Sequence, residues 1–103
     1  MRALKPKICV LGVFVADANY TAKKQPRLGE TVLGSNFYLG PGGKGSNQAV
    51  GVSRLAGEVN FLSRVGNDFF ADIAFSFWKK ENVNAHVHRD EKSYTGSAFI
   101  YIN

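Results

Sequence analysis

Residues 40–47 read Gly40-Pro41-Gly42-Gly43-Lys44-Gly45-Ser46-Asn47, a glycine-rich loop placed directly before a predicted helix. Its four glycines let the backbone take positive φ and let a ligand approach main-chain N–H groups. From Gly45 to Leu55, Ala49, Val52 and Ala56 recur at spacings of three and four, which predicts a helix packed through one narrow face. The free N–H groups at its start favour an anion or a hydroxyl-rich ligand. The loop is therefore a candidate ligand cradle.

Strands flank this loop and helix on both sides. Ile8-Cys9-Val10-Leu11 is a continuous apolar run, typical of a strand buried on both faces at the centre of a parallel sheet, with a buried and inert Cys9 thiol. Val59 to Val65, stopped by Gly66, is a second strand, and residues 31–39 favour short, partly exposed strands. The alternation predicts an α/β fold, a parallel sheet flanked by helices, with a small side sheet.

The second half of the chain predicts an aromatic helix and then extended structure. Asp68 is a good N-cap, and helical spacing up to about Asn82 predicts one core face from Phe69, Phe70, Ile73, Ala74, Phe77 and Trp78. From Val83 onward the residues favour strands, with a turn at 90–92. His86 and His88 lack a third metal ligand at a suitable spacing, which favours surface positions over a metal site.

Composition narrows the class of protein. Hydrophobic residues make up 45% and charged residues 20%, as in one ordinary globular domain. The formal charge of +5 comes from scattered cations without interleaved aromatics, so nucleic acid is not an expected partner. The chain shows neither an apolar run of the roughly 20 residues that cross a bilayer nor the apolar centre of a signal peptide. We therefore expect a cytoplasmic protein without a membrane partner.

Three polar residues make the loop a candidate sugar site. Asp17 follows the apolar residues 13–16, where a core strand is expected to end, and ligands favour that edge of an open α/β sheet. Its carboxylate can accept two hydroxyl hydrogens. Lys44 adds a charged donor, and the Asn47 amide both donates and accepts. Together they suit a polyhydroxylated ligand.

Other interpretations of the glycine loop are weaker. Gly40-x-Gly42-x-x-Gly45 has the form of a dinucleotide fingerprint, but it contains Pro41 and does not follow the first core strand. It is not a Walker A loop either, because Gly45 stands where a serine or threonine should bind magnesium. A purely structural glycine turn stays open as an alternative.

Five motifs, in order, resemble the N-terminal third of a ribokinase-family (PfkB-type) carbohydrate kinase over nearly the whole chain. They are Gly12-x-x-x-Ala16-Asp17, Pro26-x-x-Gly29-Glu30-Thr31, Gly42-Gly43-Lys44-Gly45-Ser46-Asn47-Gln48-Ala49, Gly66-x-Asp68 and Thr95-Gly96. The resemblance implies that residues 1–103 are the N-terminal fragment of a single ribokinase-like kinase domain. It also implies a β-sheet lid, with strands roughly within 19–39 and 86–103.

The resemblance further implies a function for the parent protein: ATP-dependent phosphorylation of a sugar hydroxyl with Mg²⁺, by a homodimer formed through the lid. The residues implied to contact the sugar are Asp17, Gly42, Gly43, Lys44 and Asn47, with apolar contacts from Ala98 and Ile100. The family's general base and nucleotide pocket would follow residue 103, so this chain alone is not expected to turn over. A non-catalytic lid module that self-associates, or a kinase for a nucleoside or a sugar acid, remain alternatives.

Three positions depart from the family pattern. Val15 stands where ribokinases commonly carry asparagine, which leaves the identity of the sugar open. Ala56-Gly57 reverses the usual Gly-Ala order after the first helix, and Ala71 replaces a glycine. We expect the last two to be structural changes only.

Overall fold

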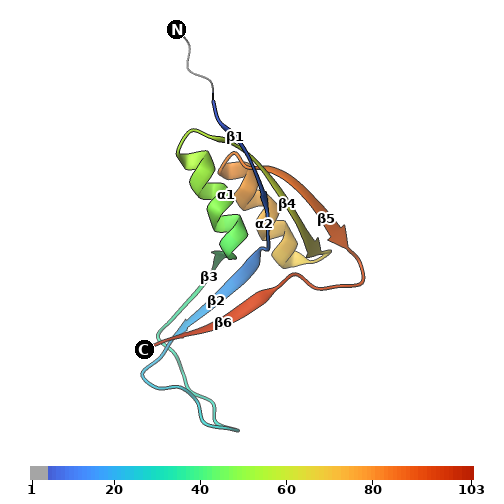
Figure 1. Ribbon diagram of the computed structural model, residues 1–103. Helices are drawn as coiled ribbons and strands as arrows, with labels where there is room; N and C mark the ends of the chain where they lie inside the picture. Colours follow the sequence, from blue (N-terminus) through green and yellow to red (C-terminus); the bar gives the residue numbers. More distant parts are fainter. Residues whose placement is uncertain (1–4) are drawn as a thin grey trace.

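The computed structural model describes residues 5–103, which form two three-stranded sheets and two helices (Figure 1). In chain order the elements are β1 Lys7–Leu11, β2 Val15–Thr21, β3 Asn36–Gly42, α1 Lys44–Arg54, β4 Glu58–Gly66, α2 Phe69–Lys80, β5 Asn84–Asp90 and β6 Ser97–Ile102. The larger sheet has the order β1-β4-β5 and is parallel throughout. The smaller sheet has the order β3-β2-β6. The predicted α/β fold with a small side sheet is confirmed.

Both helices cover the same face of the larger sheet. The strand order β1-β4-β5 advances in one direction, and right-handed crossovers then place α1 and α2 on one side. Along β4, the alternate residues Val59, Phe61 and Val65 are buried, whereas Leu62 and Arg64 are exposed. This alternation is the sign of a sheet covered by helices on one face only.

The first strand differs from its prediction. Within the described residues β1 is an edge of the larger sheet, since it pairs with β4 alone, and Cys9 is exposed. Cys9 is the register partner of Asn60, which alternates with the buried residues of β4 and so lies on the uncovered face. The predictions of a doubly buried central strand and a buried thiol were wrong, because an apolar run does not reveal which neighbours a strand has.

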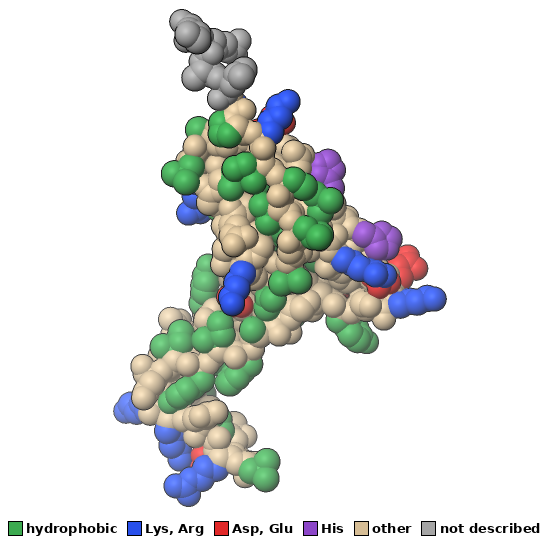
Figure 2. All heavy atoms as spheres, in the orientation of Figure 1, with side chains coloured by type: hydrophobic (Ala, Val, Ile, Leu, Met, Phe, Trp, Pro, Cys, Tyr) green, Lys and Arg blue, Asp and Glu red, His purple; other side chains and the backbone are tan. Residues whose placement is uncertain are grey.

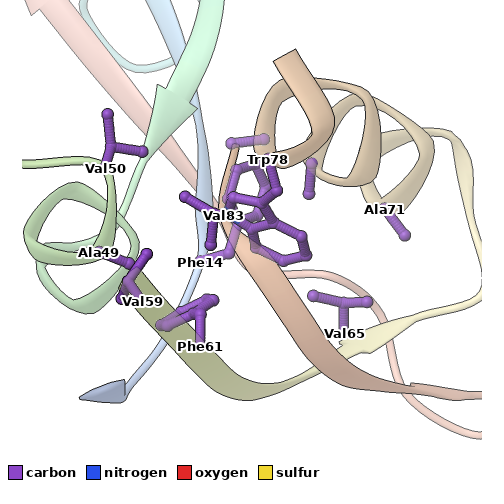
Figure 3. Packing of buried hydrophobic residues seen from close by; sticks show 11 residues of the cluster. Phe14, Ala49, Val50, Val59, Phe61, Val65, Ala71, Trp78 and Val83 are labelled. Atoms are coloured by element: carbon purple, nitrogen blue, oxygen red, sulfur yellow. The ribbon is translucent and has the colours of Figure 1, made fainter. Parts of the chain in front are cut away.

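The hydrophobic core lies between the helices and the larger sheet, around Trp78 (Figure 3). The indole is 1% exposed and makes edge contacts with three rings, whose centroids lie 5.2–5.6 Å away: Phe14, Phe61 and Phe75. The predicted core role of Trp78 is confirmed. Phe69 is 68% exposed instead, because it stands about 200° around the helix from the buried Ala71.

The smaller sheet projects from this core as an arm, which we define as β2, β3, β6 and the loop 22–35 (Figure 1). The chain measures 62 × 33 × 18 Å, and its radius of gyration of 16.7 Å exceeds the about 13 Å of a compact 100-residue domain. Lys and Arg side chains gather at the far end of the arm (Figure 2).

No described helix is long and apolar enough to cross a membrane.

The strands of the arm begin and end at other residues than the ranges predicted for the lid. β5 pairs in parallel with β4, so His86 and His88 belong to the larger sheet, and of residues 86–103 only β6 is a strand of the arm. On the first side the arm begins at Val15, and residues 31–33 lie in no strand. Long-range pairing, which local propensity does not encode, sets these limits.

The end of α1 and its buried face also differ from the prediction. The buried residues of this helix are Gly45, Ser46, Ala49 and Val50, and Val52 is only partly buried. Ala56 is exposed outside the helix, with a φ of 63°. The reversed Ala56-Gly57 order therefore places an alanine in the left-handed conformation that glycine takes more easily.

Candidate functional site

The arm has two faces, and the residues of β2 alternate between them. Asp17 is the register partner of Gly40 in β3 and of Ala98 in β6, while Asn19 is the partner of Tyr38 and of Ile100. Partners across strands point to the same side of a sheet. We call this side, which carries Asp17, Asn19, Tyr38, Ala98 and Ile100, the Asp17 face.

The Asp17 carboxylate lies directly over Gly42. A Cβ atom at Gly42 would come within 2.3 Å of Asp17 Oδ2, so any other residue there would force the carboxylate to move. The absence of a side chain at Gly42 is therefore what allows the carboxylate to lie at the root of the arm. Asp17 was predicted to lie where a core strand ends. In the structure it lies two residues inside β2, because residues 12–14 separate β1 from β2.

Gly43 then turns the chain sharply into α1. Its φ is 94°, and a Cβ there would lie 2.5 Å from the Val13 carbonyl oxygen. Only glycine fits such a position without strain. Gly43 is also the N-cap of α1 and offers no side-chain cap. The first amides of the helix thus begin next to the Asp17 carboxylate with part of their donor capacity free.

Lys44 and Asn47 occupy the first turn of α1. Both are exposed, and neither side chain hydrogen-bonds to a residue in the described range 5–103. The main-chain N–H of Asn47 donates to the Gly43 carbonyl at 2.9 Å. The structure therefore brings Asp17, Gly42, Gly43 and Ala98 together at one place. Lys44 follows directly at the start of α1, Asn47 lies about one helical turn beyond Gly43, and Ile100 lies further along the arm.

Ser46 is a residue that sequence reasoning missed. It is fully buried, and its hydroxyl accepts a hydrogen bond of 2.9 Å from Trp78 Nε1. Its N–H lies 3.3 Å from the Val13 carbonyl oxygen, to which it donates. The bond satisfies the indole N–H inside the core and fixes the first turn of α1 against α2. The spacing of three residues between Ser46 and the buried Ala49 could have indicated from sequence that Ser46 faces the core.

A second network fixes the other side of the arm. The Thr95 hydroxyl donates to Asp68 Oδ1 at 2.7 Å and accepts from the Gly66 N–H at 3.0 Å. The Thr95 N–H donates to Asp68 Oδ2 at 2.9 Å, and the Gly96 carbonyl accepts from the Ala16 N–H at 2.8 Å. Gly66-x-Asp68 and Thr95-Gly96, quoted above as separate motifs, therefore form one structural unit that holds β6 against β2.

Asp68 also caps α2, as predicted, by accepting from the Ala71 N–H at 2.9 Å. The backbone hydrogen bond from Thr95 is the main reason why the pKa of Asp68 is lowered from its ordinary value, and burial opposes the shift. The carboxylate is thus ionised at neutral pH and serves the framework of the site.

Val15 and His86, which the sequence analysis also discussed, lie in different sheets. Val15, the register partner of Gly42, lies at the root of the Asp17 face, so the departure from the family pattern is located in the site itself. His86 hydrogen-bonds to Asn60 at 2.9 Å on the larger sheet. Residues 5–103 contain no group of three His, Cys, Asp or Glu side chains that could bind a metal ion.

A separate hollow of about 420 Å³ lies beside the start of α2. Its lining consists of Asp68, Phe69, Phe70, Tyr94, Thr95 and Ser97. None of the sequence-predicted site residues contributes to it. The candidate functional site is therefore the Asp17 face with the adjoining start of α1, where the predicted residues lie close together, and not this hollow.

Together, the parallel sheet, the arm and the glycine loop at their junction define a ribokinase-like α/β architecture. The sequence profile described as pfkB family carbohydrate kinase matches residues 5–103. The chain belongs to this family.

Individual relatives of known name also belong with carbohydrate kinases. The chain is 42% identical over 95 residues to a ribokinase of Bacillus subtilis, covering 92% of this chain and 32% of that protein. It is 34% identical over 97 residues to a deoxyribokinase of Salmonella typhi, covering 93% and 32%. Among solved structures, the Arabidopsis thaliana ribokinase complexed with ribose and ATP superposes with a TM-score of 0.84 at 25% identity, covering 97% and 33%. The chain thus spans about a third of the length of these relatives.

Proposed function

We propose that this chain is the acceptor-binding part of a sugar kinase that transfers a phosphoryl group from ATP to a sugar hydroxyl. The observation that carries the proposal is the Asp17 carboxylate over Gly42, next to the uncapped start of α1. An ionised carboxylate accepts hydroxyl hydrogens, while helix amides and Lys44 donate to hydroxyl oxygens. A neighbouring pair of sugar hydroxyls uses both kinds of partner.

The residues of this chain would contribute positioning to the reaction. Phosphoryl transfer depends mainly on holding the acceptor in line and on neutralising charge. Asp17 and the α1 amides would fix the orientation of the sugar, and Ala98 and Ile100 would offer it apolar contact from β6. ATP with Mg²⁺ would supply the phosphoryl group, held by parts of the full-length protein beyond this chain.

A panel of acceptors in the full-length protein tests this proposal. We expect ATP-dependent formation of a sugar phosphate from a free pentose, deoxypentose or hexose, measured by coupled ADP release and by mass spectrometry of the product. The relatives named ribokinase and deoxyribokinase make the first two the first choice. Turnover of a nucleoside or a sugar acid, with none of a free sugar, would favour the alternative acceptor class. No turnover of any of these acceptors would contradict the proposal.

Self-association through the arm is a second proposed property. The face opposite Asp17 carries a cluster of Tyr20, Phe37 and Phe99, with ring centroids 4.9 and 5.3 Å apart and exposed fractions of 44%, 54% and 63%. β3 and β6 are the free edges of the smaller sheet in the described chain. An exposed aromatic cluster between free edges suits pairing with a second copy.

Sedimentation of the chain and of Phe99→Asp tests this property. We expect a dimer for the parent sequence and a monomer for the variant. A clean monomer of the parent sequence would contradict self-association through the arm.

A further inference from the structure

We propose that Tyr38 is a stacking platform for the ring of the acceptor sugar and that Asn19 binds a further hydroxyl of that ring. The two residues would then determine which sugars the site accepts. This inference rests on the proposed sugar-kinase function and names the class of its acceptor, a sugar in its cyclic form.

The ring of Tyr38 lies on the Asp17 face, over the backbone of Gly40. A Cβ at Gly40 would come within 2.5 Å of Tyr38 Cε1 and 3.0 Å of its Cζ, so the ring occupies the space that a side chain would take there. Gly40 is also the register partner of Asp17. The ring and the carboxylate are therefore neighbours, one over Gly40 and the other over Gly42.

Tyr38 differs from the aromatic residues on the opposite face of the arm. Tyr20 and Phe37 pack against each other, whereas the Tyr38 ring pairs with no other aromatic ring among residues 5–103. Tyr38 is 62% exposed and is not part of the hydrophobic core. An aromatic face beside a carboxylate suits a sugar, whose ring presents apolar C–H groups on one side and hydroxyls at its rim.

Asn19 holds this arrangement in place and adds a polar group. Its Nδ2 donates to the carbonyl oxygens of Asp17 at 3.2 Å and Tyr38 at 3.1 Å. Both amide hydrogens are used in this way, and no hydrogen bond to Oδ1 is formed by residues 5–103. Oδ1 is therefore an available acceptor on the Asp17 face.

The spacing along β2 defines what the site could recognise. Asn19 lies two residues beyond Asp17, a distance of about 7 Å along a strand. A sugar ring resting on Tyr38 could place hydroxyls at Asp17 and at Asn19 simultaneously. An open-chain polyol lacks the flat C–H face and would lose the contribution of Tyr38.

Tyr38→Leu in the full-length protein tests the platform, with Tyr38→Phe as the conservative variant. Tyr94→Leu is the matched control, since Tyr94 is exposed in the segment before β6, outside the Asp17 face. We expect Tyr38→Leu to raise the acceptor KM about three- to tenfold with little change in kcat, because the ring would contact the sugar equally in the bound state and in the transition state. Tyr38→Phe and Tyr94→Leu should leave the KM near that of the parent protein.

Proton NMR of the bound sugar gives a readout that a structural role would not change. Ring C–H protons stacked on Tyr38 should shift upfield in the parent protein and in Tyr38→Phe, and this shift should be lost in Tyr38→Leu. An acceptor KM and a shift in Tyr38→Leu equal to those of Tyr94→Leu would overturn the platform.

Asn19→Leu tests the further hydroxyl. The parent protein should prefer one sugar to the deoxy analogue that lacks the contacted hydroxyl, and the variant should lose that preference. An unchanged preference for every deoxy analogue would overturn the role of Asn19. If Asp17→Ala raises the acceptor KM while the Tyr38 and Asn19 variants do not, only this inference fails. If no sugar is phosphorylated, both it and the proposed function fail.

Discussion

The larger sheet and the arm each have three strands, but they are stabilised in different ways. The larger sheet buries one face under two helices, and its core residues Phe61, Ala74 and Trp78 are almost fully inaccessible. The arm leaves both of its faces partly exposed and depends on anchors at its root: the Asp68–Thr95 network, the Ala16–Gly96 hydrogen bond and the turn at Gly43. Packing under the helices therefore stabilises the larger sheet, whereas the arm keeps side chains such as Tyr38 and Phe99 exposed.

Removing the central core residue should have the largest effect and separate the two regions most clearly. Trp78→Ala removes three aromatic contacts and leaves the buried Ser46 hydroxyl without its donor. We expect a loss of about 3–5 kcal/mol in the free energy of unfolding, measured with urea. Tyr20→Ala in the arm should cost about 1 kcal/mol, as expected for a half-exposed aromatic pair. Equal losses would show that the arm is not the less packed region.

The junction between the two regions should be the next most sensitive place. Gly43→Ala places a Cβ 2.5 Å from the Val13 carbonyl oxygen at a φ of 94°. We expect a loss of about 3 kcal/mol in unfolding free energy and a weakened sugar site. Gly51→Ala is the matched control in the same helix, since a Cβ there meets no atom within 4 Å.

The control should act in the opposite direction. Gly51→Ala should stabilise the chain by about 0.5–1 kcal/mol, because glycine is costly inside a helix. Destabilisation by Gly51→Ala, or tolerance of Gly43→Ala, would contradict the described turn.

The smallest of these effects should depend on pH. Asp68→Ala removes the α2 cap and the two hydrogen bonds from Thr95, and it should cost about 2 kcal/mol at neutral pH. Because the folded pKa of Asp68 is lowered, its contribution is complete above its ordinary value of 3.8 and is lost as the pH falls through the lower folded value. Urea unfolding at neutral pH and at pH values below 3.8 should show the gap between parent and variant closing in acid.

Asp72→Ala is the matched control for this measurement. It removes an exposed carboxylate from the same turn, where Asp72 pairs with Arg89, but no backbone cap. We expect it to cost less than about 1 kcal/mol. A gap between the parent and Asp68→Ala that stays constant in acid would mean that the carboxylate charge does not support the network.

Local chemistry made much of the fold predictable from sequence. The helix starting at the glycine loop, the Asp68 cap and the turn at Asp90 are confirmed, because they depend on neighbouring residues. The edge position of β1 and the membership of β5 in the larger sheet were not predictable. Both depend on pairing between distant residues, which a single sequence does not show.

The candidate site was predictable in outline, because motif resemblance assembled Asp17, Gly42 and Ala98 without any geometry. The bond from Trp78 to Ser46 and the ring of Tyr38 over Gly40 were missed. These contacts depend on which way a side chain points in the folded chain. Periodicity indicates the face of an element but not the neighbour that it meets.

The acceptor KM of Asp17→Ala in the full-length protein tests the central claim most directly. A carboxylate that accepts hydroxyl hydrogens contributes about 1.5–3 kcal/mol, so the KM for the preferred sugar should rise about tenfold or more. The KM for ATP should stay unchanged, since the nucleotide would be held by other parts of the protein. An acceptor KM that is unchanged across all candidate sugars would contradict the placement of the sugar on the Asp17 face.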